Sequence, residues 1–556
     1  MPTSQLERRE RPKVSTRTLP QRCASLLVGF LARARAFSAR HPAIEPVREP
    51  YEPGVTPLTK TLLGPALVGF FSCVAIVVGA SQPASPFTLK LAGSWFFGIP
   101  ALPKIQGLTP PPSQGLFLGV VLVYGGMVLL LRAWYDIVRV TSRYRSIPVS
   151  RLVPVFIAWT APLLLVAPLF SHDLYSYAAL GEMVTHSINP YHFGPSVLGS
   201  ASPFNILVDP LWRNVPTPYG PLFLLLDGGI VAATGHSVLV SVVGLRLLAL
   251  AGVVAFSVGV VRIARSMGRD GAAAFALAAL NPLVLLHLIA GGHNDALMLG
   301  FLVLGYAFAR EGRPIVGIIL CGLGAAVKVP ALIGAIYIGW EWLGTGRSLR
   351  DRIRPVGTAL ALAVGVMAAL SEAAGLGWGW INGLSNPDTV RSWLDPATGI
   401  GLLAGKIIAL VGLGDHTHIL LTLARGSALL AAAVIALLLL MRSEEIGSIR
   451  ALGFSLNAIV VLSPVIQPWY AAWGFVVLAP IAQGRVRQVL VVVSGISCFL
   501  GLPGGRVLVD ELGIANPVLV GLAAAALLGV GTIVVYPKLR KIMTSRGNRN
   551  LVPQGS

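Results

Sequence analysis

Ionisable side chains are sparse in this sequence, and one short segment gathers several of them. Residues 171–177 read SHDLYSY, which places the carboxylate of Asp173 beside the imidazole of His172 and the phenol of Tyr175. The segment follows a long apolar run, so we expect Asp173 at the edge of a low-dielectric region. There a carboxylate can accept a proton from a substrate hydroxyl while most water is excluded. The alternative is an interfacial helix cap followed by aromatic side chains at a membrane surface.

Two further segments place polar groups at the ends of apolar runs. HNDALM contains His293, Asn294 and Asp295, which could hydrogen-bond a sugar, supply a base in place of Asp173, or simply cap a helix. Lys328 lies between two apolar runs, where a charge is costly and usually has a partner or a function. It could hold a phosphate headgroup, or it could extend its ammonium group to the membrane surface.

Aromatic and amide side chains collect in three other segments. PTPYGP is a rigid turn around Tyr219, QPWY contains Gln467, Trp469 and Tyr470, and Arg391 lies in a late loop rich in tryptophan. Aromatic faces and amides suit a sugar site, although aromatic side chains also form ordinary belts at membrane interfaces. These residues are therefore candidates for substrate binding.

The amino-acid composition indicates that these segments belong to a membrane protein. Of 556 residues, 54% are hydrophobic and only 12% are charged, and the mean hydropathy is +0.75. A soluble chain carries about 25% charged residues, so a soluble cytosolic enzyme is excluded, and so is a disordered chain. The net charge of +20 comes from 43 basic and 23 acidic residues. Because basic residues collect in cytoplasmic loops of membrane proteins, this charge does not indicate a nucleic-acid partner.

Several motifs are missing from the sequence. It contains neither a P-loop nor a dinucleotide-binding fingerprint, and its four cysteines show no disulfide or zinc spacing. No cluster of metal ligands has a recognisable spacing, so we predict no cofactor and assign no metal ligand. Acidic residues in outer loops, such as Asp209 and Asp395, leave a metal requirement open.

Long apolar runs predict an all-α polytopic membrane protein with about fourteen transmembrane helices. The expected spans are 61–81, 115–132, 153–170, 239–264, 271–289, 294–309, 314–327, 329–344, 355–375, 419–441, 450–466, 468–483, 487–502 and 516–536. With the N-terminus inside, nearly every basic cluster falls on the cytoplasmic side, as the positive-inside rule requires. The long loops rich in Pro, Trp, Tyr and His then face outward, which indicates that the chemistry takes place on the outer face.

This topology divides the chain into five parts. Residues 1–55 form a basic cytoplasmic tail that could hold an interfacial helix, and 56–170 form the first transmembrane helices. Residues 171–238 form a large outer loop with a juxtamembrane helix. Residues 239–536 form the remaining transmembrane core with an outer loop at 375–418. Residues 537–556 are a cytoplasmic tail ending in LVPQGS, which resembles a protease-site linker.

Seven segments, in this order along the chain, resemble one family of membrane glycosyltransferases. They are HDLYSYAALGEM (172–183), INPYHFGPSVLG (188–199), DPLW (209–212), PTPYGPLF (216–223), LNPLVLLHLIAGGHNDALMLG (280–300), AAVKVPAL (325–332) and QPWY (467–470). The family is the polyprenol-phosphomannose-dependent α-1,6-mannosyltransferases of actinobacteria, within the GT-C superfamily, and the resemblance is closer to its MptB branch. It covers roughly residues 60 to 540.

The resemblance implies a fold and a reaction. The fold would be the GT-C fold, with extracytoplasmic loops and juxtamembrane helices. The donor would be polyprenyl-phosphomannose, and the acceptor a lipid-anchored α-1,6-mannan of the lipomannan type, on the outer face of the plasma membrane. The acidic residue that GT-C enzymes carry in the first long outer loop falls on Asp173, which would act as general base in an inverting displacement. Lys328, with His293 or Arg391, would stabilise the departing phosphate.

Three other functions stay open. A sister GT-C enzyme would use another polyprenyl-linked sugar, such as arabinofuranose. A transporter or flippase would move a lipid-linked sugar without forming a glycosidic bond, although few charges are expected near the middle of the membrane, where transporters place their sites. A scaffold would bind glycans without turnover.

Overall fold

The computed structural model describes residues 58–82, 85–88, 112–143, 147–383 and 395–500. The two tails, the span expected at 516–536 and Arg391 lie outside these residues. Within them the chain forms helices and loops, together with a single antiparallel bridge between Thr88 and Leu169. The predicted all-α class is therefore confirmed for the described part of the chain.

Five of the described helices are long and apolar enough to cross a membrane. They are α2 (Leu58–Ala80), α3 (Pro112–Arg143), α8 (Val238–Ser266), α13 (Leu349–Ala373) and α16 (Thr417–Met441). A sixth crossing is formed if the π-helix η3 (Val284–Ala290) and α10 (Asp295–Arg310) are taken together, although the pair is bent by 112°. The chain is thus a polytopic helical membrane protein.

Shorter helices overlap seven of the other predicted spans: α4 (Val153–Leu164), α9 (Gly271–Ala278), α11 (Pro314–Ala325), α12 (Leu332–Glu341), α18 (Ser448–Val461), α19 (Ala471–Leu478) and α20 (Gly484–Cys498). Three more lie in segments that were predicted as outer loops: α5 (Asp173–Thr185), α7 (Pro221–Ala233) and α15 (Pro396–Leu410). Single turns or short pieces connect them: η1 (Val149–Arg151), η2 (Pro195–Leu198), α6 (Pro203–Ile206), η4 (Val329–Ala331), α14 (Trp380–Gly383), α17 (Ser443–Ile446), η6 (Pro468–Tyr470) and η7 (Ala479–Ile481).

Proline explains why apolar runs became short helices. Pro282, Pro330 and Pro468 each lie where one apolar stretch gives way to the next. A proline lacks the backbone N–H that continues a helix, and its ring clashes with the preceding turn. Pro282 falls inside the expected span 271–289, which the structure divides into α9 and η3. Pro330 and Pro468 fall at the start of expected spans, and there a short 3-10 helix, η4 or η6, takes the place of the first α-helical turn. The expected count of fourteen spans is accordingly not confirmed, since five or six described helices meet the length criterion.

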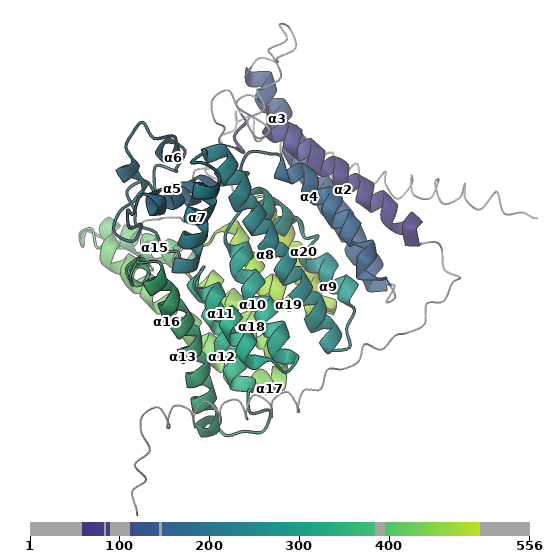
Figure 1. The fold of residues 1–556 in the computed structure, drawn as a ribbon, viewed down its shortest axis with the longest axis vertical. Coiled ribbons are helices and arrows are strands. Elements are labelled where there is room, and N and C mark those ends of the chain that lie inside the picture. The colour runs from purple at the N-terminus through teal and green to yellow at the C-terminus, as the bar shows by residue number, and fades with distance from the viewer. Residues whose placement is uncertain (1–57, 83–84, 89–111, 144–146, 384–394, 501–556) are drawn as a thin grey trace, which may run out of the picture.

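The described helices form a central bundle with three groups around it (Figure 1). Helices α2, α3 and α4 pack together along one side of a central bundle that contains α8, α10, α11, α12, α18 and α19. Helices α5, α6 and α7 lie near one another at one end, and α13, α15 and α16 flank the bundle. Several large apolar side chains on α16 are exposed, as expected for a face in contact with lipid, and Leu430 is 67% exposed.

Glycine allows a close contact between helices α8 and α10. A Cβ atom on Gly252 of α8 would lie 2.4 Å from the backbone carbon of Ala296, at the start of α10. One turn further along, a Cβ on Gly300 would lie 2.8 Å from the carbonyl oxygen of Gly252. Small residues at such crossings let two membrane helices approach until their backbones touch. The start of α10 is thereby held firmly against α8.

The ends of several bundle helices share a set of ion pairs, which we call the basic end. Arg262 at the end of α8 pairs with Glu311 just after α10, and Arg352 near the start of α13 pairs with Glu444 of α17. The hydroxyl of Tyr306 in α10 donates to Glu341 at the end of α12 over 2.7 Å. The other ends of α10, α11 and α12, at residues 295, 325 and 332, lie away from this basic end.

Candidate active site

Asp173 is the first residue of α5, and the residues before it fix its position. The chain turns at Phe170, whose φ of 62° lies in the left-handed region that few side chains adopt. The hydroxyl oxygen of Ser171 then accepts the backbone N–H of Asp173 over 3.1 Å and helps to begin the helix. His172 occupies the cap position but makes no capping hydrogen bond through its side chain. The start of a helix favours a negative charge, which suits the Asp173 carboxylate.

Two ring-bearing side chains approach the Asp173 carboxylate. The hydroxyl of Tyr177, one turn later in α5, donates to its Oδ2 over 3.3 Å. Nε2 of His293 lies 3.6 Å from the same oxygen. Burial raises the pKa of Asp173 above its ordinary value, and it outweighs the opposing effects of the Ser171 hydrogen bond and the charge of Lys328. A raised pKa makes this group a stronger proton acceptor than an ordinary carboxylate.

Lys328 lies between α11 and η4, where it forms a salt bridge with Asp295. Its Nζ donates to Oδ1 and Oδ2 of Asp295 over 2.9 and 3.0 Å, and Nε1 of Trp473 donates to Oδ1 over 2.6 Å. The ammonium group also lies 4.4 Å from the centre of the Tyr470 ring. Burial opposes the charge on Lys328, but Asp295 and Tyr470 outweigh it and raise the pKa, so the lysine remains a cation.

Asp295 is poorly placed to act as a base. Its side chain is only 1% exposed, against 22% for Asp173. Both of its oxygens already accept hydrogen bonds from Lys328, and one accepts from Trp473 as well. The geometry therefore gives Asp295 the role of holding Lys328 in place.

His293 lies between Asp173 and the aromatic wall of the cavity, which is formed by Trp469, Tyr470 and Trp473. Its ring stacks on Trp469 with 3.5 Å between the centres and 17° between the planes. Its Nδ1 lies 2.7 Å from the carbonyl oxygen of His287, and a carbonyl oxygen can only accept, so Nδ1 carries the proton. Nε2 is the nitrogen that faces Asp173.

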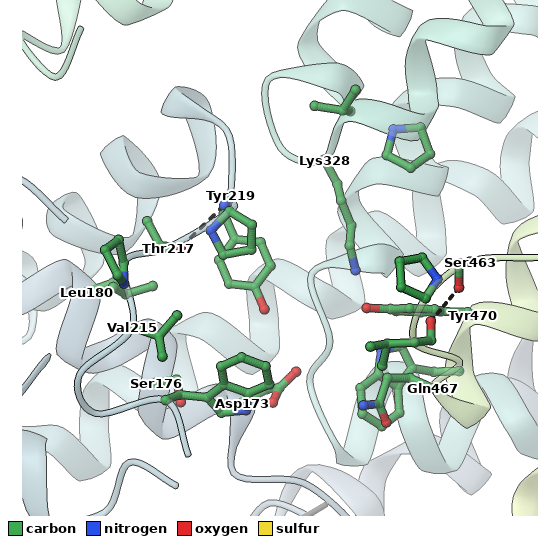
Figure 2. Close-up of a pocket in the computed structure, with 18 of the residues that line it drawn as sticks. Asp173, Ser176, Leu180, Val215, Thr217, Tyr219, Lys328, Ser463, Gln467 and Tyr470 are labelled. Atoms are coloured by element: carbon green, nitrogen blue, oxygen red, sulfur yellow. Dashed lines mark hydrogen bonds between the residues drawn. The ribbon is translucent and has the colours of Figure 1, made fainter. Parts of the chain in front are cut away.

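These residues surround a cavity of about 290 Å³ (Figure 2). Asp173 and Tyr219 approach it from one side and Lys328 and Tyr470 from the other, with their polar ends toward the space between. Most of the remaining lining is apolar or aromatic: Leu180, Pro195, Trp212, Val215, Pro216, Pro218, Val329, Pro330, Ile459, Pro464, Val465, Trp469 and Trp473. A mainly apolar cavity with a few converging polar groups is typical of a ligand site.

A sharp break in the chain brings His293 and Asp295 to the cavity. The π-helix η3 and helix α10 meet at the bend of 112°, and π-helices occur frequently at functional sites. Gly292, at the break, has a φ of 69°, and a Cβ there would lie 2.4 Å from a side-chain carbon of Leu174. Only glycine satisfies both conditions without strain.

A buried arginine donates to backbone carbonyl groups at the ends of α4 and η3. Arg246 of α8 is 2% exposed and donates to the carbonyl oxygens of Leu164, Val166 and Ala290 over 3.0, 2.5 and 3.0 Å. Leu164 ends α4, and Ala290 ends η3. Irregular backbone inside a membrane protein requires such internal partners, since lipid provides none.

The loop that carries Gln467 is held by helices α15 and α16. Asp395 Oδ1 accepts the backbone N–H of Ile466 over 2.9 Å. The hydroxyl of Thr398 donates to the carbonyl oxygen of Pro464 over 2.8 Å and accepts from Nε of Arg425 over 3.0 Å. One wall of the cavity therefore depends on contacts with the flanking helices.

The structure brings together most, but not all, of the predicted site residues. Six of them line the cavity: Asp173, Tyr219, Lys328, Gln467, Trp469 and Tyr470. His293 and Asp295 lie directly behind it, in contact with Asp173 and Lys328.

The remaining predicted residues have other surroundings. His172 faces Asp209, with 3.6 Å between Nδ1 and Oδ2, and Tyr175 is buried; neither lines the cavity. Asn294 is buried in the break before α10. These three residues belong to the surrounding structure. Arg391 lies outside the described residues.

Two residues that are not among the predicted site residues take part in the site, and one of them, Tyr177, belongs to the SHDLYSY segment that contains Asp173. Trp473 donates to Asp295, and Tyr177 donates to Asp173. Each follows a selected residue, Trp469 or Asp173, by four positions. On a helix this spacing puts both side chains on one face, so it was the signal that could have identified them.

Comparisons with known proteins agree on one kind of enzyme. Residues 66–344 match the family described as alpha-(1->6)-mannopyranosyltransferase, N-terminal domain, and residues 397–531 match the MptB C-terminal domain. No solved structure matches the chain.

Three relatives show how far the similarity extends. A probable alpha-(1->6)-mannopyranosyltransferase of Mycolicibacterium smegmatis is 35% identical over 66% of this chain and 72% of its own length. Alpha-(1->6)-mannopyranosyltransferase A of Mycobacterium tuberculosis is 33% identical over 79% of this chain and 83% of its own. Alpha-(1->6)-mannopyranosyltransferase B of Corynebacterium glutamicum is 32% identical over 74% of each chain.

Proposed function

Because this chain belongs to the alpha-(1->6)-mannopyranosyltransferase family and is an MptB-like mannosyltransferase, we propose that it transfers mannose from polyprenyl-phosphomannose to a lipid-anchored α-1,6-mannan. The observation that carries the proposal is that Asp173 and Lys328 line one cavity from opposite sides. A base and a cation on opposite sides of one cavity are what an inverting displacement at a sugar phosphate needs.

The base acts on the acceptor. A mannose hydroxyl of the acceptor attacks the anomeric carbon of the donor, and its proton passes to Asp173 as the new C–O bond forms. The bond from the anomeric carbon to the phosphate oxygen breaks, and its electron pair leaves with the polyprenyl phosphate. Attack on the face opposite the leaving group converts a β-phosphomannose into an α-linkage. The raised pKa of Asp173 suits this role, since an efficient base has a pKa close to the working pH.

The cation acts on the leaving group. Lys328 is already paired with Asp295, so it occupies its position before any substrate binds. A phosphate that leaves with an extra negative charge interacts with it more strongly than the bound donor does, which stabilises the transition state selectively. Tyr470, whose ring lies beside the ammonium group, completes this side of the cavity.

The polyprenyl chain of the donor and the sugar rings need different surroundings. The apolar part of the lining, including Ile459 and Val465, suits a polyprenyl chain. Trp469, Trp473 and Gln467 offer aromatic faces and an amide for sugar rings. We therefore place the phosphate near Lys328, between the lipid chain and the mannose.

We also propose that the active site faces the extracytoplasmic side of the plasma membrane, within a GT-C fold. Support comes from the basic end of the bundle, where Arg262 and Arg352 lie. Basic residues mark the cytoplasmic side. Helices α10, α11 and α12 place Asp295 and Lys328 at their other ends.

The test is a reconstituted reaction. Purified full-length chain in detergent is incubated with labelled polyprenyl-phosphomannose and an α-1,6-linked dimannoside, and the linkage of the product is determined. We expect an α-1,6-linked trimannoside. Product formed only with a polyprenyl-linked arabinofuranose would overturn the donor assignment. Movement of labelled lipid across vesicles without any glycosidic product would instead favour a flippase.

A further inference from the structure

A cluster of two histidines and one glutamate lies outside the catalytic cavity. Glu182 and His186 belong to the end of α5, and His236 lies in the turn between α7 and α8. One carboxylate contacts both imidazoles, with 3.1 Å from Oε1 to Nε2 of His186 and 2.6 Å from Oε2 to Nδ1 of His236. None of the three residues lines the cavity around Asp173.

The backbone holds all three side chains toward one point. Glu182 and His186 are four residues apart on α5, so they share one face of the helix. His236 has a φ of 58°, a left-handed conformation that is uncommon for a residue with a side chain. Helix α5 is packed tightly on α7, since a Cβ at Gly181 would lie 2.5 Å from the carbonyl oxygen of Asp227. The distance between the two elements is thereby fixed.

This ligand set fits a transition-metal ion. The donor atoms of the three side chains lie within 4.8 Å of one another. Tetrahedral Zn²⁺ with bonds of about 2.0–2.1 Å needs ligand atoms roughly 3.3 Å apart, a separation that small rotations of these side chains provide. Two imidazole nitrogens and one carboxylate oxygen are a common zinc set that leaves one position open. The imidazole side chains are 57% and 48% exposed, so an ion can reach them, whereas Glu182 is 12% exposed.

We propose that Glu182, His186 and His236 form a binding site for a divalent transition metal, with Zn²⁺ as the ion that fits best. The ion joins the end of α5, which begins at Asp173, to the turn that follows α7. Helix α7 is in turn preceded by the segment that carries Tyr219. The site therefore fastens together two elements that shape the cavity, and it acts by stabilising the fold rather than by contacting substrate.

The sequence alone predicts no metal ligand. Glu182 and His186 do show the four-residue spacing of two ligands on one helix, but this pair is common on solvated helix faces. His236 is remote in the sequence, and it joins the pair only because α5 and α7 pack side by side. The third ligand is what distinguishes a site from a surface pair.

Zinc binding to purified protein tests the proposal directly. Tag-free full-length chain in detergent is stripped with a chelator, the chelator is removed, and Zn²⁺ alone is added by equilibrium dialysis. Bound metal is measured per chain, and thermal unfolding is followed with and without Zn²⁺. We expect one Zn²⁺ per chain and a higher Tm with Zn²⁺ than without, because a ligand that binds the folded state stabilises it. We expect His186→Ala to weaken binding by about tenfold or more and His186→Ala/His236→Ala to abolish both effects.

Matched variants separate a site from general attraction to histidines. His192 is another exposed histidine, and we expect His192→Ala to bind Zn²⁺ like the unmodified chain. Glu182→Gln keeps the shape of the side chain while removing its charge, and we expect it to lower the affinity. The proposal is wrong if the unmodified chain binds no more Zn²⁺ than His186→Ala/His236→Ala, or if His192→Ala loses as much. Should the double variant fail to fold, the exposed single change His186→Ala decides the outcome.

Discussion

Replacing Asp173 with asparagine tests the proposed chemistry most directly. Asparagine keeps the size of the side chain and still accepts the hydrogen bond from Tyr177, but it cannot take a proton from an acceptor hydroxyl. Among the described residues that line the cavity, Asp173 is the only carboxylate. The nearby Asp295 is 1% exposed and engaged by Lys328, so no second base can replace the first.

Because no other carboxylate among the described residues of the cavity can act as the base, the loss of kcat should be large. General acid–base catalysis contributes about 10²–10⁴-fold. We expect Asp173→Asn to lower kcat by about 10³–10⁴-fold, which corresponds to ~4–5 kcal/mol in the activation barrier. KM for the donor should change little, because Lys328 and the aromatic wall remain in place.

The assay measures initial rates of trimannoside formation with polyprenyl-phosphomannose and an α-1,6-dimannoside. Asp351→Asn is the matched control, since Asp351 is an exposed carboxylate at the start of α13, next to the basic end. Thermal unfolding in the same detergent shows whether each variant is folded. A folded Asp173→Asn protein with kcat within tenfold of the unmodified chain would refute the assignment of Asp173 as base.

Three further predictions follow from the same structure. Because the pKa of Asp173 is raised, the base becomes protonated at a pH above the ordinary carboxyl pKa of about 3.9, and kcat/KM falls as the pH drops through that value. A pH–rate profile with its acid limb at or below pH 4 would contradict this. Lys328→Met leaves the buried Asp295 carboxylate without its cation and should destabilise the fold by about 3–5 kcal/mol. Adding Asp295→Asn should restore most of the Tm but not the turnover, and a fully active double variant would show that the cation is dispensable. Gly252→Ala pushes α8 away from α10 and should lower the free energy of unfolding by about 1–3 kcal/mol. In the control Gly357→Ala, the new methyl group meets no atom within 4 Å, so this change should leave stability unchanged or raise it. Equal shifts in Tm for the two variants would argue against the close contact between α8 and α10.

Local polarity was sufficient to select the segments of the site. Asp173, Lys328 and QPWY stood out because each places polar groups next to an apolar run, where such groups are costly. Long apolar runs likewise predicted the all-α class, and five of these runs correspond to the long helices α2, α3, α8, α13 and α16.

The sequence did not predict how these segments are arranged relative to one another in space. The meeting of His293 with Asp173, and of Asp295 with Lys328, depends on the bend between η3 and α10. No residue pattern encodes an angle of this kind, since glycine at position 292 permits the bend without specifying it. Hydropathy also overestimated the lengths of some helices, because it does not register that Pro282 divides the run 271–289 or that Pro330 and Pro468 start the next runs with a short 3-10 helix.

The three carbonyl groups held by Arg246 have a consequence for how the protein is made. Arg246 lies on α8, which the ribosome completes before it synthesises the bent pair of η3 and α10. Two of its acceptors, Leu164 and Val166, come earlier still, and the third, Ala290, comes later. The guanidinium group and two of its three acceptors therefore precede the irregular segment in the chain, so the order of synthesis matches the order in which these peptide groups need a partner.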